Sequence, residues 1–477
     1  MNLFDNLKLS LKALNHENEL SISYLIGTHT ELPKSLIDRK KNFEGIFFRI
    51  LSFLRILFVN FTLKSSKKNV KNLLIFVSTK NQLDSLNPVI QSLKKNKVSF
   101  ELILDVGNFV KLNKNFGRYE KVLFSPKIVI IALILFIRRF PNLYYNLKKQ
   151  KKKIAIKKYF NLFCNVYAYI PYFLQIIKKN KTKFILSSND HNSSNRSLRL
   201  AAEMMSIKTI YLQHASVTKY LPPLEFDYAL LDGKKAEEGY INNFKNLKNK
   251  NARVKNNTKK CKIILSGQKK NIFSKKISKS YNLSAGIAVN NFDEFEKLEK
   301  LVKKILTVEE NCIIRTHPGQ YLLFKERLNK LTKFNKKILL SNSNNESISS
   351  FFSKVKYILS GNSSIHLEAS LAGIPTFFYQ MNKNKLVDNY EYIKNGVSFF
   401  LGNRYNIKLI KKGIKYSKSK LRYQVLKKYS ETFDTIWFNN EGHLTSIIIK
   451  KLLKNDSFDD IFKLKSSKYF YSKMILK

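Results

Sequence analysis

The chain has 477 residues, of which 44% are hydrophobic and only 15 are Gly and 9 Pro, so a largely disordered chain is excluded and two domains are expected. The formal net charge of +53 would suit a nucleic acid or an anionic membrane as partner. Only 13 of the 87 basic residues are Arg, and no nucleic-acid recognition motif is present, so we ascribe most of the charge to a lysine-rich composition of the kind that AT-rich coding produces and expect no nucleic-acid partner.

Cysteine usage and the N-terminus indicate the compartment. Cys164, Cys261 and Cys312 have no paired spacing, which is typical of a reducing environment without a disulfide framework or a zinc site. The N-terminus, "MNLFDNLKLS", has no signal-peptide pattern. No His, Cys and Asp cluster has metal-ligand spacing, so we expect no metal. These features predict a cytoplasmic protein.

Residues 1–68 are expected to form an N-terminal helical extension. Within them, "FEGIFFRILSFLRILFVNFTL" (residues 43–63) is apolar on nearly every helical face but contains Arg49 and Arg55. Arginine at the centre of a bilayer is costly, so a spanning helix is disfavoured. Both an ordinary packed helix and an interfacial helix with a basic flank remain open, and the second would make the protein peripheral on the inner face of the cell membrane. A second apolar run, residues 128–137, is too short to span a bilayer about 30 Å thick.

A regular alternation of strands and helices begins after this extension. Strands are predicted at residues 72–80, 98–106, 183–188, 208–213 and 226–233, with helices at 81–95, about 128–140, about 159–177 and 194–206. We assign residues 69–245 to an N-terminal Rossmann-like domain. Residues 241–260 are rich in Asn and Lys without periodicity and are predicted to be a linker.

The alternation resumes after the predicted linker. Strands are predicted at residues 261–267, 285–290, 311–316, 337–342, 356–361 and 376–380, with helices at 292–306 and 347–355. We assign residues 260–440 to a C-terminal Rossmann-like domain and 441–477 to a helical tail. The predicted fold class is therefore α/β, with two Rossmann-like β/α/β domains facing a cleft, and ligands are expected at the carboxyl ends of the strands.

The stretch "SGNSSIHLEASLAGIPTFFY" (residues 360–379) follows a predicted buried strand. Gly361 would turn the chain, and Ser363 or Ser364 would begin a helix whose free backbone N–H groups suit a phosphate. Glu368 lies four residues after Ser364, on the same helix face, where its carboxylate could accept ribose hydroxyls. An ordinary capped helix with a solvated glutamate is the alternative, since neither G-x-G-x-x-G nor a Walker lysine is present.

The stretch "CIIRTHPGQ" (residues 312–320) also runs from a buried strand into a loop. His317, followed by Pro318, is expected to point into the cleft, where it could donate to a phosphate or polarise a leaving group. Arg315 would add positive charge. A plain surface loop is the alternative interpretation.

Two loops of the N-terminal half carry candidate acid and base groups. In "LSSNDHNSSNR" (residues 186–196), Asp190 and His191 are adjacent, so one of them could act on a hydroxyl while the other orients it. In "TIYLQHASVTKY" (residues 209–220), His214 ends a predicted strand and would face the same cleft. A helix N-terminus rich in caps and a structural histidine are the respective alternatives.

Together, "RTHPG" and the later "SGNSSIHLEASLAGIPTFFY" resemble the C-terminal domain of GT-B-type enzymes that act on nucleotide-activated sugars. The layout is similar to bacterial capsule and surface-polysaccharide transferases, including polysialyltransferases and Kdo transferases. "YLQHASVTKYLPP" resembles their Gln-His-Gly segment, with Ala215 in place of the glycine. The resemblance covers roughly residues 183–380. It implies that residues 69–245 form an acceptor domain and residues 260–440 a nucleotide-sugar donor domain. It also implies that His317, Ser363 and Ser364 bind the donor nucleotide and that Asp190 is the base.

The predicted function is transfer of a sugar from a nucleotide-sugar donor to a surface-glycan acceptor such as capsule or lipopolysaccharide, free or lipid-linked, without metal or cofactor. Asp190, assisted by His191 or His214, would deprotonate the acceptor hydroxyl. His317 and the helix beginning at Ser363 would offset the charge on the leaving phosphate. An anionic membrane surface is a further expected partner.

Three alternatives remain. The serine and His-Pro motifs also resemble those of CDP-glycerol-type polyol phosphotransferases. A non-hydrolysing nucleotide-sugar 2-epimerase has a similar serine, glycine and glutamate layout. The third alternative, from a different class, is a non-catalytic basic protein that binds nucleic acid or membranes.

Overall fold

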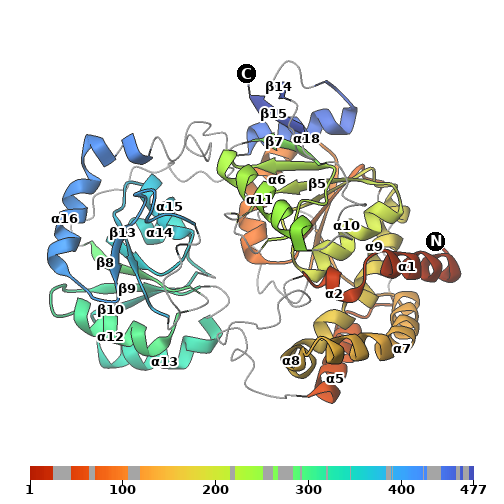
Figure 1. Cartoon of the computed structure of the whole chain (residues 1–477), viewed down its shortest axis with the longest axis horizontal. Coiled ribbons are helices and arrows are strands. Elements are labelled where there is room, and N and C mark those ends of the chain that lie inside the picture. The colour runs from red at the N-terminus through yellow and green to blue at the C-terminus, as the bar shows by residue number, and fades with distance from the viewer. Residues whose placement is uncertain are drawn as a thin grey trace. The chain divides into compact units, whose positions relative to one another are not determined.

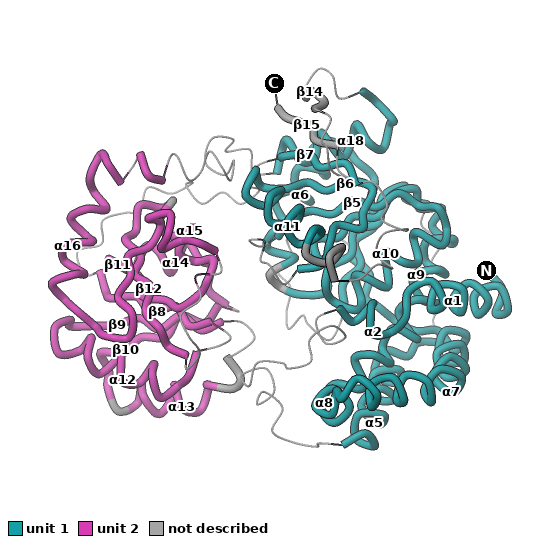
Figure 2. The backbone as a smooth tube through the Cα atoms, in the orientation of Figure 1, with its two compact units in different colours: residues 1–32, 40–270, 438–477 teal, residues 33–39, 271–437 magenta. Residues whose placement is uncertain are grey.

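The computed structural model divides the chain into two compact units, and each is described by itself (Figure 2). Unit 1 comprises residues 1–32, 40–270 and 438–477, and unit 2 comprises residues 33–39 and 271–437. The described residues are 1–24, 45–63, 70–105, 119–214, 217, 221–250, 261–266, 283–290, 293–317, 321–343, 345–382, 388, 390–422, 424–426, 442–457, 462–465 and 472–476.

A nine-stranded sheet forms the centre of unit 1, in the order β14-β15-β7-β6-β5-β4-β1-β2-β3. Every neighbouring pair is parallel except β14 and β15, which are antiparallel. The strands are β1 (Leu73–Val77), β2 (Phe100–Leu104), β3 (Glu120–Lys121), β4 (Phe184–Ser187), β5 (Lys208–Leu212), β6 (Tyr228–Leu231), β7 (Lys262–Leu265), β14 (Phe462–Lys465) and β15 (Ser472–Leu476).

Helices cover both faces of this sheet, as parallel strands require (Figure 1). They are α1 (Leu3–His16), α2 (Glu19–Ile22), α5 (Ile46–Val59), α6 (Lys80–Lys95), α7 (Pro126–Lys149), α8 (Lys153–Cys164), α9 (Val166–Asn180), α10 (Ser193–Met204), α11 (Lys234–Lys250) and α18 (His443–Lys454). Side chains alternate across a strand, so Leu74 and Phe76 of β1 join one core while Leu73, Ile75 and Val77 join the other.

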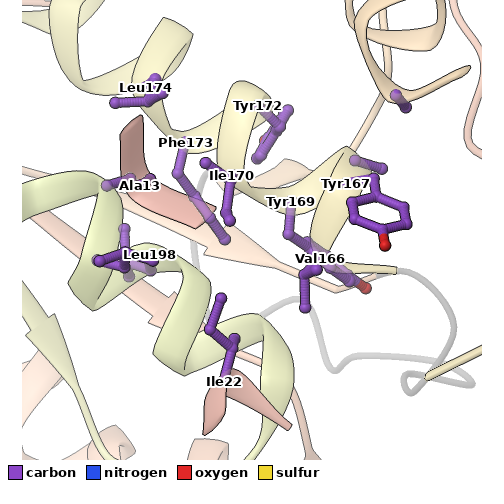
Figure 3. Packing of buried hydrophobic residues seen from close by; sticks show 14 of the residues in the cluster. Ala13, Ile22, Val166, Tyr167, Tyr169, Ile170, Tyr172, Phe173, Leu174 and Leu198 are labelled. Atoms are coloured by element: carbon purple, nitrogen blue, oxygen red, sulfur yellow. The ribbon is translucent and has the colours of Figure 1, made fainter. Parts of the chain in front are cut away.

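The larger core of unit 1 includes the N-terminal helices. Ala13 of α1 and Ile22 of α2 are fully buried in the same cluster as Ile170 and Phe173 of α9 (Figure 3). The Asn6 side-chain amide also donates to the Pro171 carbonyl oxygen at 3.0 Å. The N-terminal segment predicted as an extension is therefore packed into unit 1 rather than set apart from it.

Three predicted segments are placed differently from expectation. Residues 262–265, expected to open the donor domain, form β7 beside β6 of unit 1. The predicted helical tail, residues 441–477, contributes α18 and the strands β14 and β15 to unit 1, because β15 pairs with β7. The predicted linker also begins with the last turns of α11, and its residues 251–260 lie outside the described residues.

Unit 2 is built around a six-stranded parallel sheet in the order β10-β9-β8-β11-β12-β13. Its elements are β8 (Ser284–Ala288), α12 (Phe295–Ile305), β9 (Cys312–Arg315), α13 (Tyr321–Phe334), β10 (Ile338–Ser341), α14 (Ile348–Phe352), β11 (Val355–Ser360), α15 (Ile365–Leu371), β12 (Thr376–Tyr379), β13 (Phe399–Gly402) and α16 (Ile407–Ser417). One face packs on α12 through Leu298 and Leu301, and the other on α14 and α15 through Phe351 and Ala369.

Both units are thus parallel α/β structures with helices on each face, which confirms the predicted fold class. The cleft between them stays a prediction. In both sheets the strands that carry the candidate residues lie side by side: β4 next to β5 in unit 1, and β9, β8 and β11 in succession in unit 2. The carboxyl ends of neighbouring parallel strands meet at one edge of a sheet, so the sheet order brings together residues far apart in sequence.

Candidate functional site

The loop that carries Asp190 leaves the carboxyl end of β4 and is held by asparagine side chains. The Asn189 Oδ1 atom accepts from the backbone N–H groups of His191 at 2.9 Å and Asn192 at 2.8 Å. The Asn192 side chain in turn caps α10 by accepting from the Asn195 backbone N–H at 2.8 Å. Such local side-chain bonds fix a turn and a helix start together. The loop therefore presents its side chains from a rigid frame.

Asp190 and His191 form a hydrogen-bonded pair in this loop. The Asp190 Oδ1 atom lies 2.8 Å from His191 Nδ1, with the Asp190 side chain 1% exposed and the His191 side chain 22% exposed. Since a carboxylate only accepts, Nδ1 carries the proton in the neutral ring, which leaves Nε2 with a lone pair. That Nε2 atom lies 3.3 Å from the Asn189 amide nitrogen, a donor. His191 is therefore held in the tautomer of a general base.

Two tyrosines complete the surroundings of Asp190. The Tyr240 hydroxyl donates to Asp190 Oδ2 at 2.7 Å and lies 2.8 Å from the Tyr211 hydroxyl. Burial alone would raise the pKa of Asp190, but the hydrogen bond and charge of His191, with the Tyr240 hydrogen bond, lower it below its ordinary value. Asp190 therefore stays ionised, and both of its carboxylate oxygens accept hydrogen bonds. Tyr240 comes from α11, and sequence reasoning missed it.

His214 lies beside this pair, at the carboxyl end of β5. Its ring centroid is 6.3 Å from that of His191, and the two rings are nearly parallel at 26°. The His214 carbonyl oxygen accepts from the Ser85 hydroxyl of α6 at 3.2 Å, which anchors the strand end. The structure therefore brings Asp190, His191 and His214 together. Ala215, the departure from the Gln-His-Gly segment, lies outside the described residues.

A buried charge cluster supports the Asp190 loop from behind. Arg196 of α10 donates to the Asp190 carbonyl oxygen at 3.2 Å and pairs with Glu225 at 3.0 Å. It also forms an ion pair with Glu17, in the turn between α1 and α2, and Glu17 pairs with Arg199 as well. Burial opposes ionisation of Glu17, but the two guanidinium groups lower its pKa to about 2. The N-terminal helices are thus connected to the candidate site.

In unit 2, Arg315 is held inside the fold. Its guanidinium donates to the Ser341 hydroxyl at 2.8 Å and to the Glu346 carbonyl oxygen at 3.1 Å, and lies over the Phe351 ring at 5.4 Å from the centroid. These contacts join β9, β10 and the turn before α14. His317, two residues further, is half-buried, and Pro318 lies outside the described residues.

The chain after β11 turns sharply at Gly361. A Cβ atom at this position would lie 2.8 Å from Asn290 Nδ2 and 3.0 Å from Asp293 Oδ1, so a larger residue would have to displace these side chains at the end of β8. The Ser363 hydroxyl then accepts from the Ile365 backbone N–H at 3.4 Å, while the half-buried Ser364 occupies the N-cap of α15 without a side-chain cap bond. The serines therefore stand at the start of α15, as the sequence predicts.

The candidate groups of unit 2 lie at the carboxyl ends of the strands in its sheet. His317 follows β9 and Gly361 follows β11, with β8 between them, so they are separated by two strand spacings, about 10 Å. The half-buried Glu368 lies one turn along α15 from Ser364. His317, the serines and Glu368 therefore come from neighbouring positions at the carboxyl ends of the unit 2 strands.

Asp293 is a buried carboxyl that sequence reasoning missed. Its Oδ2 atom accepts from the Asn290 backbone N–H at 2.8 Å. Burial raises its pKa to about 7, with Glu294 adding to the effect. It acts on the site indirectly, by bordering Gly361.

His366, inside the serine stretch, has a structural position. Its Nε2 atom donates to the Gly361 carbonyl oxygen at 2.8 Å, and its Nδ1 lies 3.1 Å from the Ser398 hydroxyl. The ring is fully buried and stacks on Phe378 at 5.8 Å between centroids. Burial lowers its pKa to about 4. His366 therefore holds the Gly361 turn as a neutral ring.

This depressed pKa predicts an acid sensitivity. The unfolded chain binds a proton at His366 below about 6.5, whereas the folded state does so only below about 4, so folding stability falls as the pH drops through this window. The loss should approach about 3 kcal/mol. Denaturant unfolding at a series of pH values measures it, as the difference between wild type and His366→Gln. A difference that stays constant from pH 7 to pH 4 would contradict this account.

Comparisons with known proteins are restricted to the level of fold. No family model and no curated protein sequence matches the chain. Among solved structures, similarity is found to a putative UDP-N-acetylglucosamine 2-epimerase from Listeria monocytogenes, with 12% identity, 82% of this chain and 98% of that chain covered, and a TM-score of 0.48. The wall teichoic acid polymerase TagF has 12% identity, coverage of 86% and 98%, and a TM-score of 0.49. The glycotransferase of kitacinnamycin has 8% identity, coverage of 80% and 99%, and a TM-score of 0.47.

Among the described residues, no group of three or more His, Cys, Asp or Glu side chains is arranged to hold a metal ion. The candidate groups at the carboxyl ends of the strands are a carboxylate, histidines, and hydroxyl and backbone donors.

Proposed function

We propose that the chain is a glycosyltransferase that moves a sugar from a nucleotide-sugar donor to a hydroxyl group of a surface-glycan acceptor. The observation that carries the proposal is the Asp190–His191 pair, joined at 2.8 Å at the carboxyl end of β4. Glycosyl transfer needs a base that removes the acceptor proton and an environment that accepts a departing nucleotide phosphate. Unit 1 carries a candidate for the first task, and unit 2 carries candidates for the second.

On the acceptor side, His191 is assigned the proton transfer. Its Nε2 lone pair would take the hydroxyl proton, while Asp190 would stabilise the imidazolium that forms. The near-complete burial of Asp190 and its hydrogen bonds to His191 and Tyr240 support this division of roles. Asp190, which the family resemblance suggests as base, thereby acts through His191. His214 would orient the acceptor from the neighbouring strand.

On the donor side, the backbone of the Gly361 turn and the hydroxyl groups of Ser363 and Ser364 are assigned to the phosphates. His317 would donate a hydrogen bond to the leaving phosphate from the other side of β8, and Glu368 would hold the ribose. Donors arranged in advance around a developing negative charge lower the barrier without requiring a metal ion. The order of these motifs along the chain and their common sheet edge support the assignment.

A thermal-shift screen with CMP, CDP, UDP and GDP tests the donor assignment. A nucleotide at a hundred times its Kd should stabilise the wild type by about 2.7 kcal/mol, because it binds only the folded state. Ser363→Ala and His317→Ala should each weaken binding about tenfold or more, since each removes a hydrogen bond to a charged group. Ser353→Ala, at the end of α14, is a matched control and should bind as wild type.

Activity assays then separate the alternatives. Transfer from a nucleotide sugar only when an acceptor is present supports the proposal. Activity with CDP-glycerol or CDP-ribitol alone would make the protein a polyol phosphotransferase, and conversion of a nucleotide sugar without acceptor would make it an epimerase. If all four nucleotides failed to stabilise the protein while nucleic acid bound with steep salt dependence, the enzymatic assignment would be wrong.

A further inference from the structure

Exposed apolar side chains gather on one face of α5 and on the segment that follows it. Phe47, Leu51 and Phe58 fall on one side of the helix, and Phe47 and Phe58 are 65% and 71% exposed. Val59, the last residue of α5, is 67% exposed, and Leu63, at 81%, continues this surface beyond the helix end. Large aromatic and aliphatic side chains clustered on a surface in this way indicate an interaction site.

The surface extends to a second segment through backbone pairing. Phe61 forms a parallel bridge with Phe124, and the Thr62 backbone N–H donates to the Phe124 carbonyl oxygen at 3.0 Å. This pairing places the exposed Leu123 beside the end of α5. We define the α5 apolar surface by its members Phe47, Leu51, Phe58, Val59, Phe61, Leu63 and Leu123.

The opposite face of α5 fixes the helix to unit 1. Phe53 and Leu57 are buried there, and the Phe53 ring lies 5.4 Å from the Phe136 ring of α7. Arg49 is also on the buried side and donates to the Lys158 carbonyl oxygen of α8 at 3.2 Å. Helices α5, α7 and α8 gather together in unit 1 (Figure 1). The exposed residues are therefore held on a packed scaffold.

The charge of this scaffold is predominantly positive. Residues 45–63 contain two basic residues and no acidic one, and residues 120–160 contain eleven basic residues and one acidic residue, Glu120, whereas the whole chain has 34 acidic residues. Arg55 is exposed within the apolar face of α5 itself, and Lys121 and Lys157 are exposed in segments that contact α5 or Leu123. A surface that combines bulky apolar groups with predominantly positive charge complements an anionic lipid surface.

We propose that the α5 apolar surface docks on an anionic membrane, with α5 lying in the plane of the lipid headgroups. Two stretches, Pro126–Lys149 and Lys153–Asn180, are long and apolar enough to cross a bilayer by length and composition. Most of the second is buried inside the protein, and Ile131 and Leu135 of the first are buried in the same core. Docking through exposed side chains leaves this core intact, whereas spanning would dismantle it. This inference does not depend on the proposed function.

Flotation of the full chain with lipid vesicles tests the inference. The wild type should bind vesicles of equal parts phosphatidylcholine and phosphatidylglycerol, and bind pure phosphatidylcholine much more weakly. The triple variant Phe47→Ser, Leu51→Ser and Phe58→Ser should lower the partition coefficient on mixed vesicles about tenfold or more. The matched control replaces three exposed apolar residues of unit 2, Leu339, Phe400 and Leu421, with Ser and should bind as wild type.

Further measurements decide between membrane docking and the alternatives. Arg55→Glu, a single exposed change that keeps the apolar residues, should weaken binding to the mixed vesicles about fivefold or more, and it serves if the triple variant does not fold. Equal weakening by the unit 2 control, or binding that added salt removes while the α5 triple variant leaves it unchanged, would overturn the proposal in favour of general charge attraction. If the triple variant instead loses self-association without losing vesicle binding, a second copy of the chain covers this surface. Nucleotide stabilisation should stay unchanged in all variants.

Discussion

Replacing His191 with Gln is expected to slow glycosyl transfer by about 10²- to 10⁴-fold, the usual contribution of a positioned general base. Glutamine keeps a polar side chain of similar size but has no basic nitrogen. Asp190→Asn should have an effect of similar order, because an amide cannot hold the tautomer that leaves Nε2 free to accept a proton. Steady-state kinetics with a saturating donor measure both losses, and they should appear in kcat.

The controls for this prediction separate chemistry from folding. His443→Gln replaces an exposed histidine at the start of α18 and should leave the rate unchanged. Tyr240→Phe removes the hydrogen bonds of the Tyr240 hydroxyl to Asp190 and to the Tyr211 hydroxyl, and should slow transfer about tenfold or less, with a shifted pH–rate profile. All variants should retain nucleotide stabilisation, since the donor residues lie in unit 2. A His191→Gln protein with near wild-type kcat would remove His191 from the mechanism and leave Asp190 or His214 as base.

The alternation of strands and helices could be predicted because the strands are short apolar runs. The sequence "LLIFV" of β1 is buried at every position, and the helix predicted at residues 292–306 buries Phe295, Leu298, Leu301, Val302 and Ile305 at helical spacing, as α12. Where helices cover both faces of a parallel sheet, the apolar pattern is strong and local. The candidate loops at the strand ends could be predicted for the same reason.

The strands at one edge of the unit 1 sheet could not be predicted in this way. The strands β14 and β15, "FKLK" and "SKMIL", are short and partly polar, and their place in the sheet depends on pairing with β7 about 200 residues earlier. Helix α11 is different, because its helical spacing of apolar residues is present in the sequence. Ala236, Tyr240 and Phe244 recur every four residues and are all buried, although the Asn and Lys content around them is typical of a linker.

The supporting residues of the site depend on tertiary contacts. Tyr240 reaches Asp190 across 50 residues, and Glu17 reaches Arg196 across 179 residues. No spacing rule connects residues so far apart, and in the sequence Glu17 is an ordinary surface-type glutamate. Because the fold buries this carboxylate, its negative charge needs a positively charged partner. The sequence therefore identified groups at the strand ends but not those that hold them.

Replacing Arg196 with Met is expected to destabilise unit 1 by about 3–5 kcal/mol, the usual cost of removing one partner from a buried ion pair. The guanidinium is 4% exposed and contacts Glu17, Glu225 and the Asp190 carbonyl oxygen. Its loss leaves the Glu17 carboxylate buried with Arg199 as its remaining cation. Denaturant unfolding at pH 7 measures the loss of stability. Arg327→Met, which removes an exposed ion pair with Glu296 in unit 2, is the control and should cost less than about 1 kcal/mol.

The same cluster gives an acid dependence that identifies Glu17 as the responsible group. Its pKa is lowered to about 2 in the folded state, so it stabilises the fold above about pH 4.5, and this contribution of about 3 kcal/mol is lost as the pH falls toward 2. Glu17→Gln should remove that part of the pH dependence, and Arg196→Met should shrink it because the folded-state pKa rises toward its ordinary value. Since Arg196 also holds the Asp190 backbone, transfer activity should fall in Arg196→Met even where the protein remains folded. An Arg196→Met protein with wild-type stability and activity would show that the N-terminal helices do not support the Asp190 loop.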